Sequence, residues 1–251
     1  MGKYSLNEEI EIEFWRTSEV EGPTSDSLVN ILRCAAEARI FLNKLEKFKH
    51  YFSGAEKIME LGGGQCWASA IVKRYFNHKT IIGSDISKYA VESAHKWERI
   101  FGYALDDKVD CKSYEIPVED GSLDLVFAYA AAHHFARHEK TFIELKRVLK
   151  PGGVCLYLHE PCCGRLLHPL AKWRVNLKRP EVPEDVLVVP QLRRLATKHG
   201  LKMRYERDAT LVNRKPFETI YYLVLNLLPF FAYLLPCSGD LIIHKPNEDS
   251  N

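Results

Sequence analysis

After Gly54, short β-type runs alternate with helical runs, and this alternation limits the possible folds more than any other feature of the sequence. The β-type runs are Lys57–Leu61, Thr80–Ser84, Val109–Tyr114, Leu123–Ala130, Val154–His159, Lys202–Ala209 and Asp240–Lys245. The helical runs are Trp67–Phe76, Lys88–Ile100, His138–Leu149 and Gln191–His199. Strand–helix alternation of this kind builds a parallel sheet with helices on both faces, so the sequence predicts an α/β fold.

The residues before Gly54 follow a helical pattern instead. Ser25 and Asp26 can cap a helix in which apolar residues recur at helical spacing from Leu28 to Phe52. The sequence therefore predicts a helical segment ahead of the sheet.

The composition is that of a globular protein. The chain has 251 residues, of which 46% are hydrophobic and 27% charged, enough for one large α/β domain. Its formal net charge of +2 gives no sign of a nucleic-acid-binding protein. The seven cysteines lack the paired spacing of zinc ligands, and Met1–Ile10 lacks the apolar core of a signal peptide. These features predict free thiols, no metal site and a cytoplasmic location.

Three consecutive glycines, Gly62 to Gly64, stand between an apolar strand and a helix. Glycine lets the backbone turn sharply and lets a ligand approach the peptide N–H groups. A dinucleotide-binding turn would need glycine where Trp67 stands. Glu60, two residues before Gly62, would repel a pyrophosphate and attract a cation. The turn is therefore predicted to bind a cationic ligand rather than a dinucleotide.

A second candidate binding residue, Asp85, ends the next predicted strand. It follows the glycines by about 20 residues, the distance at which α/β proteins hold a ribose diol. A carboxylate can accept a hydrogen bond from each hydroxyl group of the ribose. The alternative is that Asp85 caps a helix over Ser87–Ile100.

Four segments in order carry the most specific pattern in the sequence. They are Glu60-Leu-Gly-Gly-Gly64, Ile82-Gly-Ser-Asp85, Ile116-Pro-Val-Glu-Asp-Gly-Ser-Leu-Asp-Leu-Val126 and Leu145-Lys-Arg-Val-Leu-Lys-Pro-Gly-Gly153. With them the chain resembles the class I S-adenosylmethionine-dependent methyltransferases from about Lys57 to Tyr157. The resemblance implies a Rossmann-like, seven-stranded, mostly parallel sheet whose last strand, Asp240–Lys245, is antiparallel. It also implies S-adenosyl-L-methionine as the cofactor.

The resemblance further implies a set of cofactor-binding residues: Glu60, Gly62, Gly63, Gly64, Asp85, Ile86, Ser113, Tyr114, Ala128 and Tyr129. Two positions depart from the family pattern. Cys66 stands at a family glycine position, and Lys112 stands where the family often has an Asp for the adenine amino group. Because lysine cannot accept that hydrogen bond, Ser113 and Tyr114 are expected to hold the adenine.

These patterns divide the chain into three parts. Residues 1–53 are expected to form a helical cap, and residues 54–160 the cofactor-binding core. Residues 161–251 are expected to complete the same domain, with an apolar helical insertion at about 216–236.

Candidate catalytic residues lie where the fourth and fifth predicted strands end, at the sheet edge where open α/β folds bind ligands. His133 and His134 come after the fourth strand, and His159 ends the fifth. Histidine titrates near neutral pH and can take a proton from a methyl acceptor. Neighbouring side chains alternate in direction, so at most one of the adjacent pair is expected to face a pocket. A structural role stays open for all three.

The acceptor is less well defined by the sequence. Ala130-Ala-Ala-His-His134 lacks the polar-Pro-Pro-aromatic pattern of nucleobase methyltransferases, so no DNA acceptor is expected. Arg165–Arg179 is basic and free of acids, and Ile220–Pro236 is apolar but too short to span a membrane. These segments are either a solvated face and a cap on the sheet, or a surface for an anionic membrane and a lipid-like molecule. We favour O-methylation of a small apolar or lipid-like acceptor; the oligomeric state stays open.

Two other functions fit parts of the pattern. One is a nicotinamide-dependent oxidoreductase, against which Trp67 and Glu60 both count. The other is a non-catalytic scaffold protein that keeps the fold and binds the cofactor, which the departures at Cys66 and Lys112 leave open.

Overall fold

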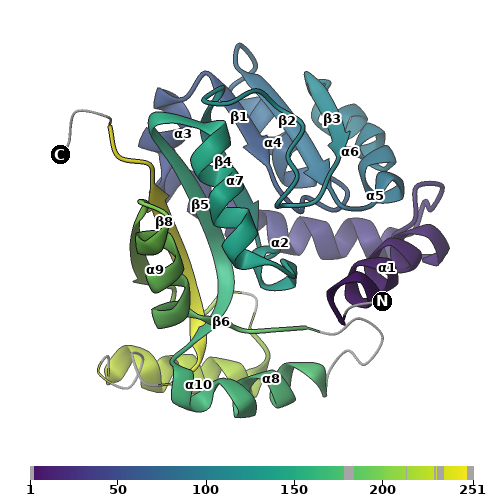
Figure 1. The fold of residues 1–251 in the computed structure, drawn as a ribbon. Helices are drawn as coiled ribbons and strands as arrows, with labels where there is room; N and C mark the ends of the chain where they lie inside the picture. The colour runs from purple at the N-terminus through teal and green to yellow at the C-terminus, as the bar shows by residue number, and fades with distance from the viewer. Residues whose placement is uncertain (1–2, 178–183, 213, 229, 231–234, 248–251) are drawn as a thin grey trace.

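The computed structural model describes residues 3–177, 184–212, 214–228, 230 and 235–247. In these ranges one mixed sheet crosses the molecule, with helices on both faces (Figure 1). The strands are β1 (Lys57–Glu60), β2 (Thr80–Asp85), β3 (Asp107–Asp110), β4 (Leu123–Tyr129), β5 (Leu149–Cys163), β6 (Leu187–Val188), β7 (Lys202–Arg207) and β8 (Cys237–His244). The α-helices are α1 (Lys3–Thr17), α2 (Leu28–Lys47), α3 (Lys49–Gly54), α4 (Trp67–Tyr75), α5 (Lys88–Glu92), α6 (Ala94–Phe101), α7 (His138–Val148), α8 (His168–Asn176), α9 (Val189–Lys198) and α10 (Pro216–Leu227). Two short 3-10 helices are η1 (Ala132–His134) and η2 (Arg165–Leu167).

The strand order is β3-β2-β1-β4-β5-β8-β7, and the two-residue β6 pairs with the end of β5. The five strands β1 to β5 run parallel to one another, whereas β8 runs antiparallel to both β5 and β7. The predicted α/β fold with an antiparallel last strand is confirmed. The chain order reverses between β1 and β4, and in open α/β sheets ligands bind beyond the carboxyl ends of the strands at such a point.

The sheet is held between two apolar layers. On one face, Phe142 of α7 and Leu192 of α9 pack against the strands. On the other face, Phe41 of α2 and Ile71 of α4 do the same. Because both faces are covered, the central strands are buried almost throughout, which explains their continuous apolar runs.

The structure corrects two predicted elements. The helix expected over Lys88–Ile100 is two helices, α5 and α6, which meet at Ser93. The Ser93 hydroxyl donates to the Tyr89 carbonyl at 3.2 Å and so competes with the regular backbone bonds. The strand expected over Val109–Tyr114 is Asp107–Asp110, because the chain then leaves the sheet in a turn closed by the Glu115 N–H on the Lys112 carbonyl.

Helix α1 lies within residues 1–53, the segment expected to be helical, but neither α1 nor α8 was predicted as a separate helix. The apolar insertion begins as α10, whose Pro216 suits a first helical turn because its missing N–H would have no partner there. Pro229 and Phe231 lie outside the described residues. No helix in the described ranges combines the length and apolar character that crossing a bilayer requires.

Candidate functional site

The three glycines form a tight turn between β1 and α4, at the point where the strand order reverses. Gly62 and Gly64 have positive φ angles of 68° and 53°, in the left-handed region that glycine adopts without strain. A Cβ atom on Gly62 would lie 3.0 Å from the Cβ of Ala131, and one on Gly64 would lie 3.0 Å from the Trp15 ring. The backbone therefore approaches its neighbours as closely as glycine alone permits.

Glu60, the last residue of β1, links the turn to helix α4. Its carboxylate accepts hydrogen bonds from the backbone N–H and the hydroxyl of Ser69, at 3.0 and 2.5 Å. Burial raises the pKa of Glu60 to about 7, although the bonds from Ser69 act in the opposite direction. A Cβ on Gly63 would lie 2.7 Å from this carboxylate. Glu60 thus fixes the turn and does not line the cavity above it.

Asp85, at the end of β2, joins the glycine turn to the next loop. One carboxylate oxygen accepts from the Gly64 N–H and the other from the Ser87 N–H, each at 2.9 Å. Burial outweighs these bonds and raises the pKa of Asp85 to about 6. The residue that caps α5 is Ser87, whose hydroxyl accepts from the Ala90 N–H. The helix-cap alternative for Asp85 is therefore wrong, and its carboxylate lies in the cavity wall.

A cavity of about 510 Å³ lies over the turn. Its walls come from α1, the glycine turn, the end of β2, residues 111–114 and residues 130–136. The described acidic residues that line it are Glu8, Glu11, Glu21, Asp85 and Glu184, against the bases Arg33 and Lys112. Because like charges that share a cavity attract an opposite charge, the acidic excess suits a cationic ligand.

The residues after β3 form one end of this cavity. The Ser113 hydroxyl lies 2.9 Å from that of Thr141, and the Tyr114 hydroxyl donates to Glu8 at 2.5 Å. The Lys112 ammonium lies 3.4 Å from the other oxygen of Glu8. Lys112 is thus paired with α1, and Ser113 and Tyr114 form the wall beside it.

Glu11 and His134 lie at the part of the cavity where α1 meets η1. The His134 Nδ1 is 3.9 Å from a carboxylate oxygen of Glu11. Burial, and then the charge of Asp85, raise the pKa of Glu11 to about 8. Sequence reasoning missed Glu11 because it missed α1. The spacing of Glu8, Glu11 and Trp15 could have revealed it, since residues three and four apart share one helix face.

His133 does not line the cavity and binds Glu160, a fully buried carboxylate near the end of β5. Its Nδ1 lies 2.8 Å from Glu160, which also accepts from the N–H groups of Ala131, Ala132 and His133. Burial lowers the pKa of His133, but the hydrogen bond and charge of Glu160 outweigh it, so that the pKa is raised. This contact fixes η1 and leaves His134 facing the cavity.

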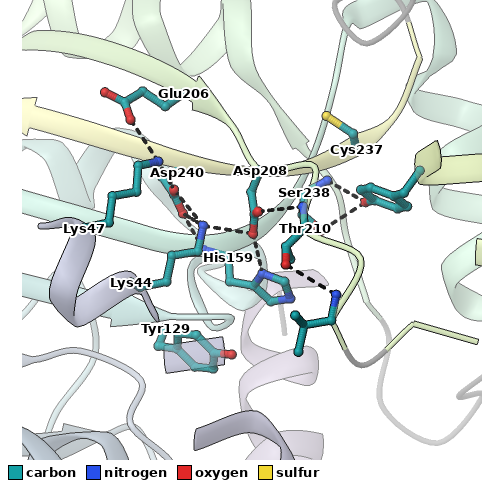
Figure 2. A network of polar contacts seen from close by, with 12 residues as sticks. Lys44, Lys47, Tyr129, His159, Glu206, Asp208, Thr210, Cys237, Ser238 and Asp240 are labelled. Carbon is teal, nitrogen blue, oxygen red and sulfur yellow. Dashed lines mark hydrogen bonds and ion pairs between the residues drawn. The ribbon is translucent and has the colours of Figure 1, made fainter. Parts of the chain in front are cut away.

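His159 belongs to a separate polar network between α2 and strands β5, β7 and β8 (Figure 2). Its backbone is left-handed, with φ at 58°, and its Nδ1 lies 2.9 Å from Asp208. The Lys44 ammonium contacts Asp208 at 2.8 Å and Asp240 at 2.7 Å. The Tyr129 ring stacks on His159 with 5.8 Å between ring centres, and its hydroxyl donates to Glu37.

The structure therefore brings together part of the predicted site. Around the 510 Å³ cavity lie Gly62, Gly64, Asp85, Ile86, Ser113, Tyr114 and His134. The predicted residues that do not line it are Glu60, Gly63, Ala128, Tyr129, His133 and His159. Ala128 is buried in the core, and Gly63 donates its N–H to the Ser84 carbonyl.

Known proteins share both the sequence pattern and the fold. Residues 59–157 match the family described as "Methyltransferase domain". A ubiquinone/menaquinone biosynthesis C-methyltransferase of Desulfotalea psychrophila is 26% identical over 121 residues, which cover 48% of each protein. A fatty-acid O-methyltransferase of Mycolicibacterium smegmatis is 26% identical over 102 residues, 41% of this chain and 36% of that one. The chain thus spans about half the length, or less, of these curated relatives.

Among solved structures, geranyl diphosphate C-methyltransferase of Streptomyces coelicolor A3(2) has the same fold, with a TM-score of 0.67. That match covers 97% of this chain and 98% of the other at 14% identity. A putative sarcosine dimethylglycine methyltransferase of Galdieria sulphuraria aligns with a TM-score of 0.60, over 96% and 98% of the two chains, at 19% identity. At such low identity, these two matches support the fold alone.

Proposed function

The chain belongs to the class I S-adenosylmethionine-dependent methyltransferases, and we propose that it transfers a methyl group from this cofactor to an oxygen of a small apolar or lipid-like acceptor. The observation that carries the proposal is the 510 Å³ cavity. It combines the glycine turn, the Asp85 carboxylate and an acidic wall at one sheet edge.

The residues of the cavity fit S-adenosylmethionine. A Cβ at Gly62 or Gly64 would intrude on the neighbouring side chains, so these glycines keep the turn tight and place it in the cavity wall beside Asp85, which accepts from the Gly64 N–H. Asp85 offers carboxylate oxygens to a ribose diol, and Ile86, Ser113 and Tyr114 offer apolar and polar surface to an adenine. The acidic wall suits the positive charge of the ligand. S-adenosylmethionine supplies the electrophilic methyl group when it is bound.

On the acceptor side we assign proton removal to His134. It lines the cavity, and the contact between His133 and Glu160 holds the η1 turn that carries it. Glu11 lies beside it and helps to orient the imidazole. An acceptor hydroxyl must lose its proton as it is methylated, and a histidine at the cavity wall can accept that proton. This arrangement is the reason for proposing oxygen as the methylated atom.

The apolar character of the acceptor rests on two lines of support. The names of two relatives refer to ubiquinone and menaquinone biosynthesis and to fatty acids. The second is the apolar surface of the C-terminal insertion, which also supports a peripheral membrane contact. We also propose that the acceptor is a small molecule and that the protein is cytoplasmic.

Turnover tests this function directly. The purified full chain, S-adenosylmethionine with a labelled methyl group and a cell extract should yield labelled lipid-soluble products. NMR of the product then distinguishes an O-methyl from a C-methyl group. His134→Ala should lower labelling about 10²-fold while binding of S-adenosylhomocysteine persists. Binding without any labelled product would instead support the non-catalytic scaffold.

A further inference from the structure

The C-terminal helices expose an unusual amount of apolar surface. The described part of the chain has 21 exposed large hydrophobic side chains. Eleven of them lie on α8, α10 and the turns beside these helices: Leu166, Leu170, Trp173, Leu177, Phe217, Ile220, Leu223, Val224, Leu227, Leu228 and Phe230. Figure 1 shows α8 and α10 together at one end of the molecule, on the far side from α4 and α6. We call these eleven residues the apolar face.

The apolar face follows the periodicity of each helix. On α10, Phe217, Ile220, Val224 and Leu227 recur three or four residues apart and are exposed, whereas Tyr222 and Leu225 are buried against the domain. Leu166, Leu170, Trp173 and Leu177 show the same spacing along η2 and α8. Because each helix already buries its opposite side, these outward stripes do not serve the packing of the domain.

Helices α8 and α10 contact each other on the sides that face the domain, and a groove separates them elsewhere. The Arg174 guanidinium lies over the Tyr221 ring, 5.7 Å from its centre. Between α8 and α10 an apolar groove of about 370 Å³ reaches Cys162 and Cys237 at the sheet. The apolar face is thus a broad surface with an apolar recess, and monomeric proteins rarely leave such large patches exposed without a partner.

Basic side chains predominate around the apolar face in the described residues, and Asp185, which contacts α8, is already paired with His168 and Lys172. Arg165, Arg174 and Lys215 are exposed beside it, and α8 carries no acid. Glu218, the acid of α10, lines the groove instead. A second copy of the chain, seated about a two-fold axis, would bring this basic surface against itself. Anionic headgroups over acyl chains provide both the negative charge and the apolar layer that the surface lacks.

We propose that the apolar face docks the protein on a bilayer that contains anionic phospholipids, with α8 and α10 lying in the plane of the interface. The basic side chains contact headgroups, while the apolar stripes enter the acyl boundary. This proposal rests on the exposed surface and does not depend on the transferase activity.

Vesicle flotation of the full chain tests the proposal. The probe is a phosphatidylcholine vesicle with or without phosphatidylglycerol. We expect binding to the anionic vesicles that weakens at high salt. Phe217→Ser with Ile220→Ser should lower partitioning about tenfold or more, because two apolar side chains leave the acyl boundary. Arg165→Gln with Lys215→Gln should lower it by roughly fivefold per charge removed.

Matched controls separate docking from general stickiness or unfolding. Tyr75→Ser with Ile100→Ser removes two similarly exposed apolar side chains from α4 and α6, and Arg193→Gln with Arg194→Gln removes two exposed charges from α9. Both control variants should float like the wild type, and all variants should keep the wild-type melting temperature and S-adenosylhomocysteine affinity. Absence of vesicle binding, or equal loss in control and test variants, overturns the proposal. So does a dimer in sedimentation that the Phe217 and Ile220 changes dissociate.

Discussion

The wild-type protein should release a proton from Glu11 when S-adenosylmethionine binds, and replacing Glu11 with Gln should abolish that release. Burial first, and the nearby Asp85 charge second, raise the pKa of Glu11 to about 8. At pH 7 about nine-tenths of the Glu11 carboxyls therefore carry a proton in the free protein. If Glu11 faces the positive charge of the ligand, binding should drive that proton off.

The expected release is large enough to measure. An opposite charge within about 4–6 Å lowers the pKa of a carboxyl by roughly 1 to 3. A lowering of about 2 would release about 0.8 of a proton from Glu11 at pH 7. S-adenosylhomocysteine lacks the sulfonium charge, so it should release much less. The Glu11→Gln variant has no proton to lose at this position.

Isothermal titration calorimetry in buffers of different ionisation enthalpy measures the proton count directly. The matched control is Glu13→Gln, which changes an exposed carboxylate on the same helix that pairs with Arg16. Its proton release should equal that of the wild type. Equal release on binding the two ligands, or release unchanged by Glu11→Gln, would refute the placement of Glu11 beside the ligand charge.

Other consequences of the structure can be tested alongside. Asp85→Ala should weaken S-adenosylhomocysteine binding about 10- to 150-fold, the loss of roughly 1.5–3 kcal/mol of hydrogen bonding, with the melting temperature recorded to check the turn; affinity within about twofold would end the ribose assignment. His134→Ala should lower turnover about 10²-fold at unchanged ligand affinity, and a fully active variant would remove His134 from the mechanism. The pKa of His133 is raised, so its contact with Glu160 stabilises the fold below about pH 6.5. That contribution should vanish as the pH rises through the folded-state pKa, and urea titrations of wild type and His133→Asn should converge there; a constant difference would contradict the assignment. Lys44→Met leaves two buried carboxylates short of a cation and should destabilise the protein by about 3–5 kcal/mol in urea, whereas exposed Lys49→Met should change stability by less than about 1 kcal/mol.

The parts of the fold set by local pattern could be predicted from the sequence. The strands around the glycine turn are short apolar runs, and Gly62 and Gly64 stand where the backbone takes positive φ values. The residues that make up each of these signals lie within a few positions of one another, so the signals can be recognised in one sequence without knowledge of distant contacts. The seven-strand path and the antiparallel last strand followed from the resemblance that the same signals support.

The parts set by distant contacts could not be predicted. Helix α1 has acids on several sides, and the contact of Glu8 with Tyr114 joins residues 106 positions apart. Local sequence pattern therefore could not predict that acids of α1 line the cavity. The bond of His159 to Asp208 likewise spans 49 positions. A histidine at a strand end gives the same sequence signal whether it faces a cavity or an ion network.

The central claim is that the cavity over the glycine turn binds S-adenosylmethionine rather than a dinucleotide. Equilibrium titration of the purified full chain with S-adenosylhomocysteine and with NAD tests it most directly. The account predicts a single S-adenosylhomocysteine site that Asp85→Ala weakens, and no measurable NAD binding. Tighter binding of NAD, or no binding of S-adenosylhomocysteine, would contradict it.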